Sequence, residues 1–240
     1  PADRQHRTKR ARPLASGALP VVLGPPLFVG LLALSFAISL VWLSPRFTLM
    51  LALYFVGTMT YSLDLKRRLL LDVLTLAGLY THRILAGGIA TGVPISAWLL
   101  GFSMFFFLSL AFAKRYVELL PLAAGAKIKN RAYYKTDLNM VASMGSASGY
   151  LAALVFSLYV ENGAHHGTYR EASILWLAVP FLLYWVSRVW ILTGRGEMAD
   201  DPVKFALKDR ISLLCGAMIA GVAALARFAP SWLSSWLHGG

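Results

Sequence analysis

Charged side chains are scarce in this chain, at 14% of its residues, and its mean hydropathy is high at +0.61. Soluble domains carry roughly 25% charged residues, so the composition excludes an ordinary soluble domain. Cysteine is almost absent: the single Cys215 lies in an apolar run, which excludes an intrachain disulfide and a cysteine metal site. The signatures GxSxG, GxxxxGK[ST] and HExxH are also missing, so no motif of a common hydrolase, P-loop NTPase or zinc protease is present.

Long apolar runs without an amphipathic stripe make up most of the chain. About 20 helical residues span a bilayer core of about 30 Å, so each run predicts a transmembrane helix. The sequence therefore predicts an all-α, polytopic transmembrane helical bundle that forms a single domain over residues 1–240 and begins with a basic segment at 1–17. We expect seven helices, at residues 27–43, 47–63, 70–90, 96–116, 138–160, 172–192 and 211–228.

The net charge of +12 would suit a nucleic-acid-binding protein, but the position of the charge argues against that class. Most of the 23 lysine and arginine residues fall in the N-terminal segment and in the loops near residues 64–69, 114–137 and 193–210, and only Arg46, Arg170 and Arg227 fall in the alternate loops. The positive-inside rule makes the basic side cytoplasmic, in the plasma (inner) membrane. The acids also gather there, except Glu161 and Glu171. This indicates either a polar site or simply longer loops on that side.

Two charged residues of the predicted helix at 70–90 are candidates for a site. Asp72 lies in its first turn, where the helix dipole alone would favour a carboxylate. With Lys66 nearby, the same carboxylate could instead hold a metal ion or a phosphate partner. Arg83 would lie about 16 Å into the helix, a costly position that usually faces a cavity or a partner. The adjacent His82 is more typical of a packed histidine than of a ligand.

The sequence KRYVEL places Lys114, Arg115 and Glu118 at the end of the predicted helix at 96–116. Glu118 is four residues from Lys114 and three from Arg115, so a local salt bridge is one interpretation. A phosphate clamp is the other, because arginine binds phosphate through two parallel hydrogen bonds. His165 and His166 lack a third ligand, so no metal site is expected there.

The opening PADRQHRTKRARPLASG resembles the end of the first aspartate-rich motif of the UbiA superfamily of intramembrane prenyltransferases, N-D-x-x-D-x-x-x-D followed by a basic segment and R-P-[LI]-x-[AS]-G. Asp3 would be the last acid of that motif. The chain is also similar to the decaprenyl-phosphate phosphoribosyltransferase branch in YxxxLK at 61–66, Asp72, YxxRxxAGG at 80–88, KRYxEL at 114–119 and ALxDR at 206–210. The family's second motif, DxxxD, is not intact, since YYKTD at 133–137 has one acid.

The resemblance implies a nine-helix fold, of which the seven helices here would be the third to the ninth, in a fragment whose N-terminal part is missing. It implies an integral membrane transferase, Mg²⁺-dependent, that moves a phosphoribosyl group from phosphoribosyl diphosphate to a polyprenyl phosphate. The fragment alone we expect to be inactive. A prenyl diphosphate:aromatic acceptor prenyltransferase is the alternative. A non-enzymatic transporter or scaffold is a lesser one, because no internal repeat is evident.

The resemblance also implies roles for particular residues. Asp3, Asp72 and Lys66 would form the catalytic set, with Mg²⁺ bound by Asp3 and Asp72. The residues expected to bind substrate are Arg4, Lys9, Arg12, Tyr61, Arg83, Lys114, Arg115, Glu118, Tyr134, Asp137, Asp209 and Arg210, and Arg83 would meet the lipid phosphate. We expect Asp3, Lys66, Asp72, Lys114, Arg115 and Asp209 to converge on one cavity that opens sideways to lipid.

Overall fold

The computed structural model describes residues 16–162, 164, 169–198 and 201–229. The predictions for Asp3, Arg4, Lys9 and Arg12, and for the two adjacent histidines at 165–166, lie outside these residues. Within them the secondary structure is helical, apart from an isolated antiparallel bridge between Lys127 and Tyr134. The all-α prediction is therefore confirmed.

Seven long helices lie close to the predicted ranges. They are α2 (Gly24–Trp42), α3 (Pro45–Leu63), α4 (Leu71–Thr91), α5 (Ala97–Leu119), α6 (Leu138–Asn162), α7 (Ala178–Gly194) and α9 (Arg210–Phe228). Short helical segments complete the described chain: η3 (Val21–Leu23), η4 (Leu65–Arg67), η5 (Lys135–Asp137), η6 (Ala172–Leu177) and α8 (Pro202–Lys208). The predicted helix at 172–192 is thus η6 followed by α7, and α8 lies where a loop was expected.

Six helical segments of the described chain are long and apolar enough to cross a membrane. They contain α2, α4, α5, α6, α7 and α9, with η6 continuing into α7. α3 has 19 residues, as many as α2, but Arg46 and several hydroxyl side chains lower its hydropathy. These segments support a polytopic membrane protein.

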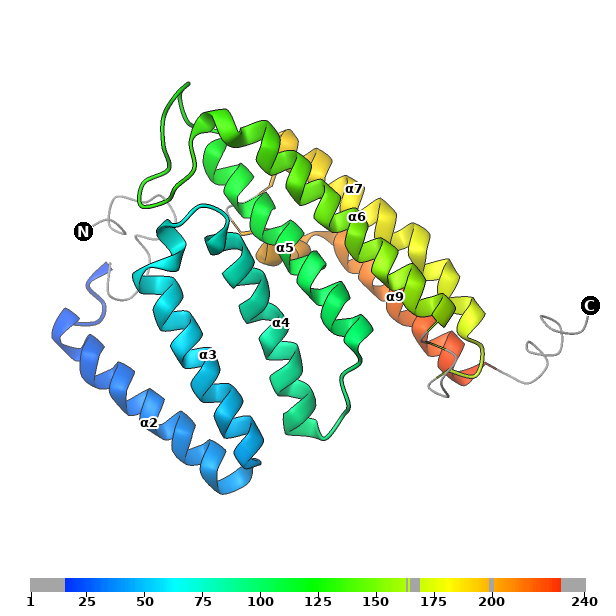
Figure 1. Cartoon of the computed structure of the whole chain (residues 1–240), viewed down its shortest axis with the longest axis horizontal. Helices are drawn as coiled ribbons and strands as arrows, with labels where there is room; N and C mark the ends of the chain where they lie inside the picture. Colours follow the sequence, from blue (N-terminus) through cyan, green and yellow to red (C-terminus); the bar gives the residue numbers. More distant parts are fainter. Residues whose placement is uncertain (1–15, 163, 165–168, 199–200, 230–240) are drawn as a thin grey trace, which may run out of the picture.

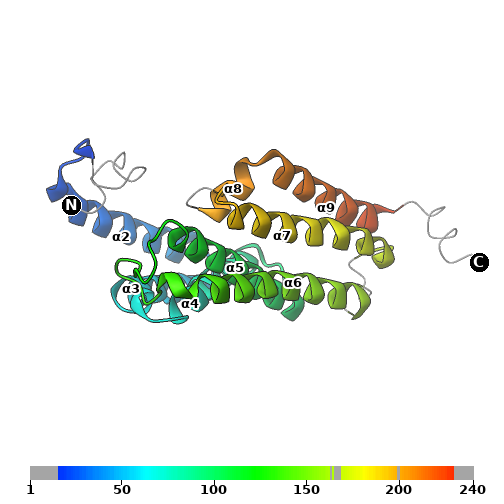
Figure 2. The same ribbon diagram turned by 90° about the horizontal axis from the view of Figure 1, so that it is seen from above.

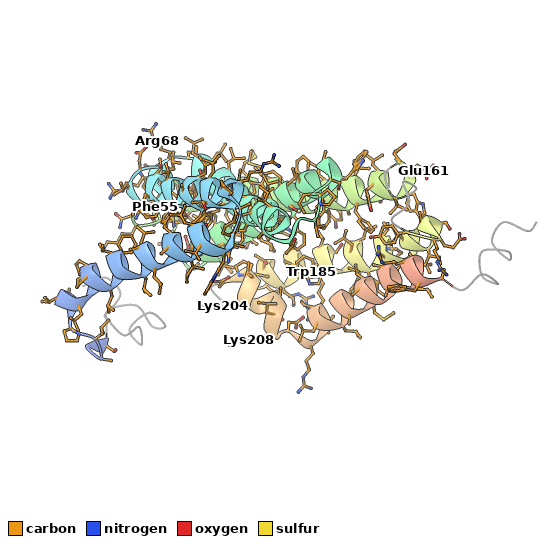
Figure 3. The ribbon with its side chains drawn as sticks, turned by 90° about the horizontal axis from the view of Figure 1, so that it is seen from below. Phe55, Arg68, Glu161, Trp185, Lys204 and Lys208 are labelled. Carbon is orange, nitrogen blue, oxygen red and sulfur yellow. The ribbon has the colours of Figure 1, made fainter. Side chains whose placement is uncertain are left out.

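The helices form two layers. α3 to α6 follow one another in chain order in the first layer, with α2 tilted away from it beside α3, and α7, α8 and α9 form the second layer (Figure 2). The loops at 64–70 and 120–137 lie together at one end of the first layer, which we call the basic end (Figure 1). Trp185 of α7 lies between the layers (Figure 3), where its ring stacks on that of Phe106 of α5 with centroids 5.3 Å apart.

α6 packs closely on its neighbours because two of its residues are glycine. A Cβ on Gly145 would lie 2.2 Å from the Trp190 ring and 2.7 Å from Cβ of Phe112. A polar chain crosses the same contact: Trp190 Nε1 donates to Ser109 Oγ at 3.0 Å, and that hydroxyl donates to the Gly145 carbonyl at 2.7 Å. Small residues and interhelical hydrogen bonds of this kind hold membrane helices together. α5, α6 and α7 therefore form a tight three-helix contact.

Replacement of Gly145 by alanine tests this contact. Gly145→Ala should lower the stability by about 1–3 kcal/mol, because the added methyl group overlaps the Trp190 ring. Gly221→Ala in α9 is the matched control, since its Cβ would meet no atom within 4 Å. It should be neutral or stabilise by up to about 1 kcal/mol, as glycine is a poor helix former. Thermal unfolding in detergent measures both, and equal unfolding temperatures would contradict the close packing.

Candidate functional site

Asp72 is the centre of a buried cluster at the basic end. Its side chain and that of Arg115 are both fully buried, and Oδ2 of Asp72 lies 3.1 Å from Nε of Arg115. Tyr133 Oη donates to Oδ1 at 2.7 Å, and Nη1 of Arg131 lies 3.7 Å from Oδ2. Arg115 also pairs with Glu118 through Nη1, so the local salt bridge that the sequence suggested is present. This cluster joins α4 and α5 to the loop at 120–137.

Tyr133 fastens that loop to the start of α4. Its hydroxyl accepts from the backbone N–H of Leu70 at 3.2 Å while it donates to Asp72. Leu70 has a φ of 62°, an unusual value for a leucine, so this contact holds a strained backbone. Burial, and then the bond to the Asp72 carboxylate, raise the pKa of the Tyr133 hydroxyl above its usual value. The hydroxyl therefore keeps its proton and remains a donor.

Arg131 links the same loop to the end of α3. Its Nη1 donates to the Tyr61 hydroxyl at 3.0 Å and to the Lys66 carbonyl at 3.1 Å. The guanidinium also lies 5.7 Å from the centre of the Tyr61 ring. Arg131, which the sequence did not single out, thus links the Tyr61 side chain and the backbone of Lys66 to Asp72.

A second group of polar residues comes from α4, α5 and the start of α8. Asp201, which caps α8, is close enough to interact electrostatically with both Lys114 of α5 and Tyr80 of α4. Tyr80 stacks on Phe107 with ring centroids 4.9 Å apart, and the Arg83 guanidinium lies 5.8 Å from the Tyr80 ring centre. α8 belongs to the layer opposite α4 (Figure 2), and of these side chains Tyr80, Lys114 and Asp201 are half-buried whereas Arg83 is exposed. We call Tyr80, Arg83, Lys114 and Asp201 the inner set.

Asp209, which was expected to converge with Asp72, instead pairs with an arginine of α7. Two parallel hydrogen bonds join it to Arg188 of α7, Nη1 to Oδ2 at 2.6 Å and Nη2 to Oδ1 at 3.1 Å. It also accepts from the backbone N–H of Ser212 at 2.7 Å and so caps α9. The Arg188 bonds, followed by those of Ser212, hold the pKa of the Asp209 carboxyl below its usual range. Asp209 thus fastens α9 to α7, and Arg210 beside it is exposed.

The remaining predicted residues lie apart from Asp72. Tyr134 is 45% exposed, and Asp137 accepts from its backbone N–H at 2.8 Å, so both shape the outer part of the loop. His82 is a packed histidine, as expected: Nε2 lies 2.9 Å from the Met50 carbonyl, and its ring stacks on Tyr54. Their roles toward substrate stay predictions.

The described residues alone do not make up a Mg²⁺ site around Asp72. Mg²⁺ requires oxygen ligands in a nearly octahedral arrangement. Oδ1 of Asp72 accepts from Tyr133, whereas Oδ2 lies within ion-pair distance of Arg115 and Arg131 but has no hydrogen-bond partner in the described part of the chain. Within the described ranges no three acidic, histidine or cysteine side chains are grouped for a metal. The predicted pairing of Asp72 with Asp3 stays a prediction, because Asp3 lies outside these ranges.

Comparison with known proteins identifies the family. The UbiA prenyltransferase family matches residues 1–214. An uncharacterised protein of Sinorhizobium fredii, y4nM, is 37% identical over 94% of this chain and 44% of its own length. The nodulation protein NoeC of Azorhizobium caulinodans is 31% identical over 89% of this chain and 70% of its length. A decaprenyl-phosphate phosphoribosyltransferase of Mycobacterium tuberculosis is 32% identical over 95% of this chain and 74% of its own length.

The chain therefore spans less than half the length of y4nM and about seven-tenths of the other two relatives. The family match covers most of the chain, and it agrees with the apolar helices of the fold. The chain belongs to the UbiA prenyltransferase family of integral membrane transferases.

Proposed function

We propose that the protein transfers a phosphoribosyl group from phosphoribosyl diphosphate to a polyprenyl phosphate, at the cytoplasmic face of the plasma membrane. One observation supports the proposal: Arg131 is a partly exposed cation at the basic end, and Arg83 is a second cation about three helical turns along α4, beside Tyr80. A soluble polyanionic donor needs the first, and a lipid phosphate that enters from the bilayer needs the second. The name of the mycobacterial relative supports the same reaction.

The inner space also suits a lipid. A cavity of about 320 Å³ lies between the layers, further toward the end opposite the basic loops. Its lining is mostly aromatic and aliphatic and includes Leu99, Phe102, Phe156, Tyr159, Leu182 and Ile219. Such a lining accepts isoprenoid units without exposing them to water. The chain of a polyprenyl phosphate would extend into this cavity from a phosphate held near Arg83.

For this reaction the protein must orient the two substrates and stabilise the charge of the leaving group. A lipid phosphate oxygen attacks C1 of the ribosyl group, the bond from C1 to the diphosphate breaks, and the diphosphate leaves with the electron pair. Fixed cations stabilise the negative charge that develops on the leaving group. We assign this role to Lys114 and Arg131. Arg115 adds a buried Nη2 without a hydrogen-bond partner in the described part of the chain. Mg²⁺ would serve the same leaving group, as the family resemblance implies, with Asp3 and Asp72 as its proposed ligands.

Label transfer tests the proposal. Membranes with the full-length natural protein should transfer radiolabel from phosphoribosyl diphosphate to decaprenyl phosphate, in a lipid-extractable product. The same membranes should not join a labelled prenyl diphosphate to an aromatic acceptor such as 4-hydroxybenzoate. Transfer only in the second assay would favour the alternative prenyltransferase, and transfer in neither would favour a non-enzymatic role. Either of these two results would contradict the proposal.

A further inference from the structure

A basic depression opens on the surface of the basic end, apart from the inner set. It has a volume of about 360 Å³ and is lined by Arg67, Lys127, Ile128, Lys129, Asn130 and Arg131, which we call the loop pocket. Four of the six lining residues are cationic and none is acidic. Like charges held together repel one another, so an arrangement of this kind is stabilised by a bound anion.

One wall of the loop pocket is a hairpin with a fixed shape. Backbone bonds close it: Lys135 N–H donates to the Ala126 carbonyl at 2.8 Å, and Ile128 N–H donates to the Tyr133 carbonyl at 3.0 Å. Asn130 takes a φ of 61° at its tip, a conformation that asparagine tolerates better than most residues. The ammonium of Lys127 lies 5.1 Å from the centre of the Tyr134 ring. The cations of this wall are therefore presented on an ordered backbone.

The opposite wall is Arg67, at the end of η4, and it is tied to the hairpin. Arg131 crosses between them through its bond to the Lys66 carbonyl at 3.1 Å. Tyr133 and Asp72 fasten the base of the hairpin to α4. Because both walls are already held in place, a ligand that binds here does not have to order them, and less of its binding energy is lost.

The neighbouring Arg68 differs from Arg67, because Arg68 has an acidic partner and lies outside the loop pocket. Arg68 pairs with Asp64 at 2.7 Å, with both side chains more than half exposed. It points away from the bundle (Figure 3) and does not line the pocket. Arg67 has no such acidic partner in the described part of the chain. The acid at this surface thus neutralises the arginine outside the pocket and leaves the one inside available.

We propose that the loop pocket binds a phosphate group. Arginine and lysine are the side chains that bind phosphate, arginine through parallel hydrogen bonds and lysine as a point charge. The group could belong to the headgroup of an anionic lipid or to a soluble phosphate compound, and the chemistry of recognition is the same. If the ligand is a soluble diphosphate, this inference rests on the proposed function, because Arg131 serves both sites; if the ligand is a lipid headgroup, it goes beyond that function.

Binding to the purified full-length protein separates the two sources. In one arm, isothermal titration calorimetry measures inorganic diphosphate. In the other, native mass spectrometry measures phosphatidylglycerol retained relative to phosphatidylcholine. The variants are Arg67→Gln and Lys129→Gln, and Arg68→Gln is the matched control with the same change of charge one residue away. Arg67→Gln should weaken binding about tenfold in one of the arms, as expected for a lost charge-assisted contact.

Each result bears on the proposal. A loss confined to diphosphate assigns the pocket to a soluble ligand, and a loss confined to phosphatidylglycerol assigns it to a lipid headgroup. If Arg67→Gln and Lys129→Gln bind both probes as Arg68→Gln does, the basic surface acts only through its net charge and the proposal is overturned. Label transfer, measured separately, reports on the proposed function alone.

Discussion

Asp72→Asn should destabilise the protein by about 3–5 kcal/mol, the typical cost of leaving a buried charge without its partner. The substitution preserves shape but removes the negative charge that faces Arg115, which has no solvent access of its own. Glu118 would still pair with Arg115, although its side chain is 32% exposed and compensates only in part. The effect is measured as the unfolding temperature of the detergent-solubilised protein, with the folded fraction read by size-exclusion chromatography after heating.

Asp64→Asn is the matched control for this prediction. Asp64 and Arg68 form an ion pair at 2.7 Å, but their side chains are 52% and 60% exposed. Exposed pairs contribute at most about 1 kcal/mol, so this variant should unfold close to the wild-type temperature. Tyr133→Phe should cost about 1–3 kcal/mol, because it removes the bonds to Asp72 and Leu70.

The double variant, which combines Asp72→Asn with Tyr133→Phe, distinguishes a structural role of Asp72 from a role as a metal ligand. If Asp72 anchors the loop through Tyr133, the two substitutions should be strongly non-additive, since each disrupts the same cluster. If Asp72 is chiefly a metal ligand, Asp72→Asn should leave the stability in the presence of a chelator unchanged. That outcome would contradict the role as an anchor that the contacts support.

The helices could be predicted because their signal is local. Each long apolar run is sufficient to specify a membrane helix, and turn residues such as Pro45 mark the ends. α8 was missed because seven residues with two lysines show no apolar run. A signal did exist: Asp201 before Pro202 is a typical N-cap followed by a proline in the first turn, and Asp201 caps α8 in the structure.

The candidate site could be predicted only in part, for a related reason. The contact between Arg115 and Glu118 follows from their spacing on one helix, and charge counting placed the basic loops together. The bonds from Tyr133 to Asp72 and from Arg131 to Tyr61 join residues more than 60 positions apart. They depend on the path of a loop that no local pattern specifies. Nothing in the sequence separates Tyr133, which is buried, from the adjacent Tyr134.

Arg83→Gln should lower kcat/KM for the polyprenyl phosphate by about 100-fold, because it removes the charge-assisted contact that would bind the lipid phosphate. Arg83 lies about three helical turns after the start of α4, is exposed, and has no acid within ion-pair distance among the described residues. A charge at that depth is costly unless it meets a partner. If the partner is the lipid phosphate, the apparent affinity for phosphoribosyl diphosphate should change little.

Arg83→Lys is the conservative variant for this prediction, and Arg46→Gln is its control. Lysine keeps the charge but loses the parallel hydrogen bonds and the planar contact with Tyr80, so Arg83→Lys should recover part of the activity. Arg46 begins α3 at the end opposite the basic loops, and its replacement should leave transfer unchanged. If Arg83→Gln transfers normally but unfolds at a lower temperature, then Arg83 supports the packing of α4 through Tyr80. The lipid phosphate would in that case be bound by other cations, of which Lys114 is the nearest candidate in the inner set.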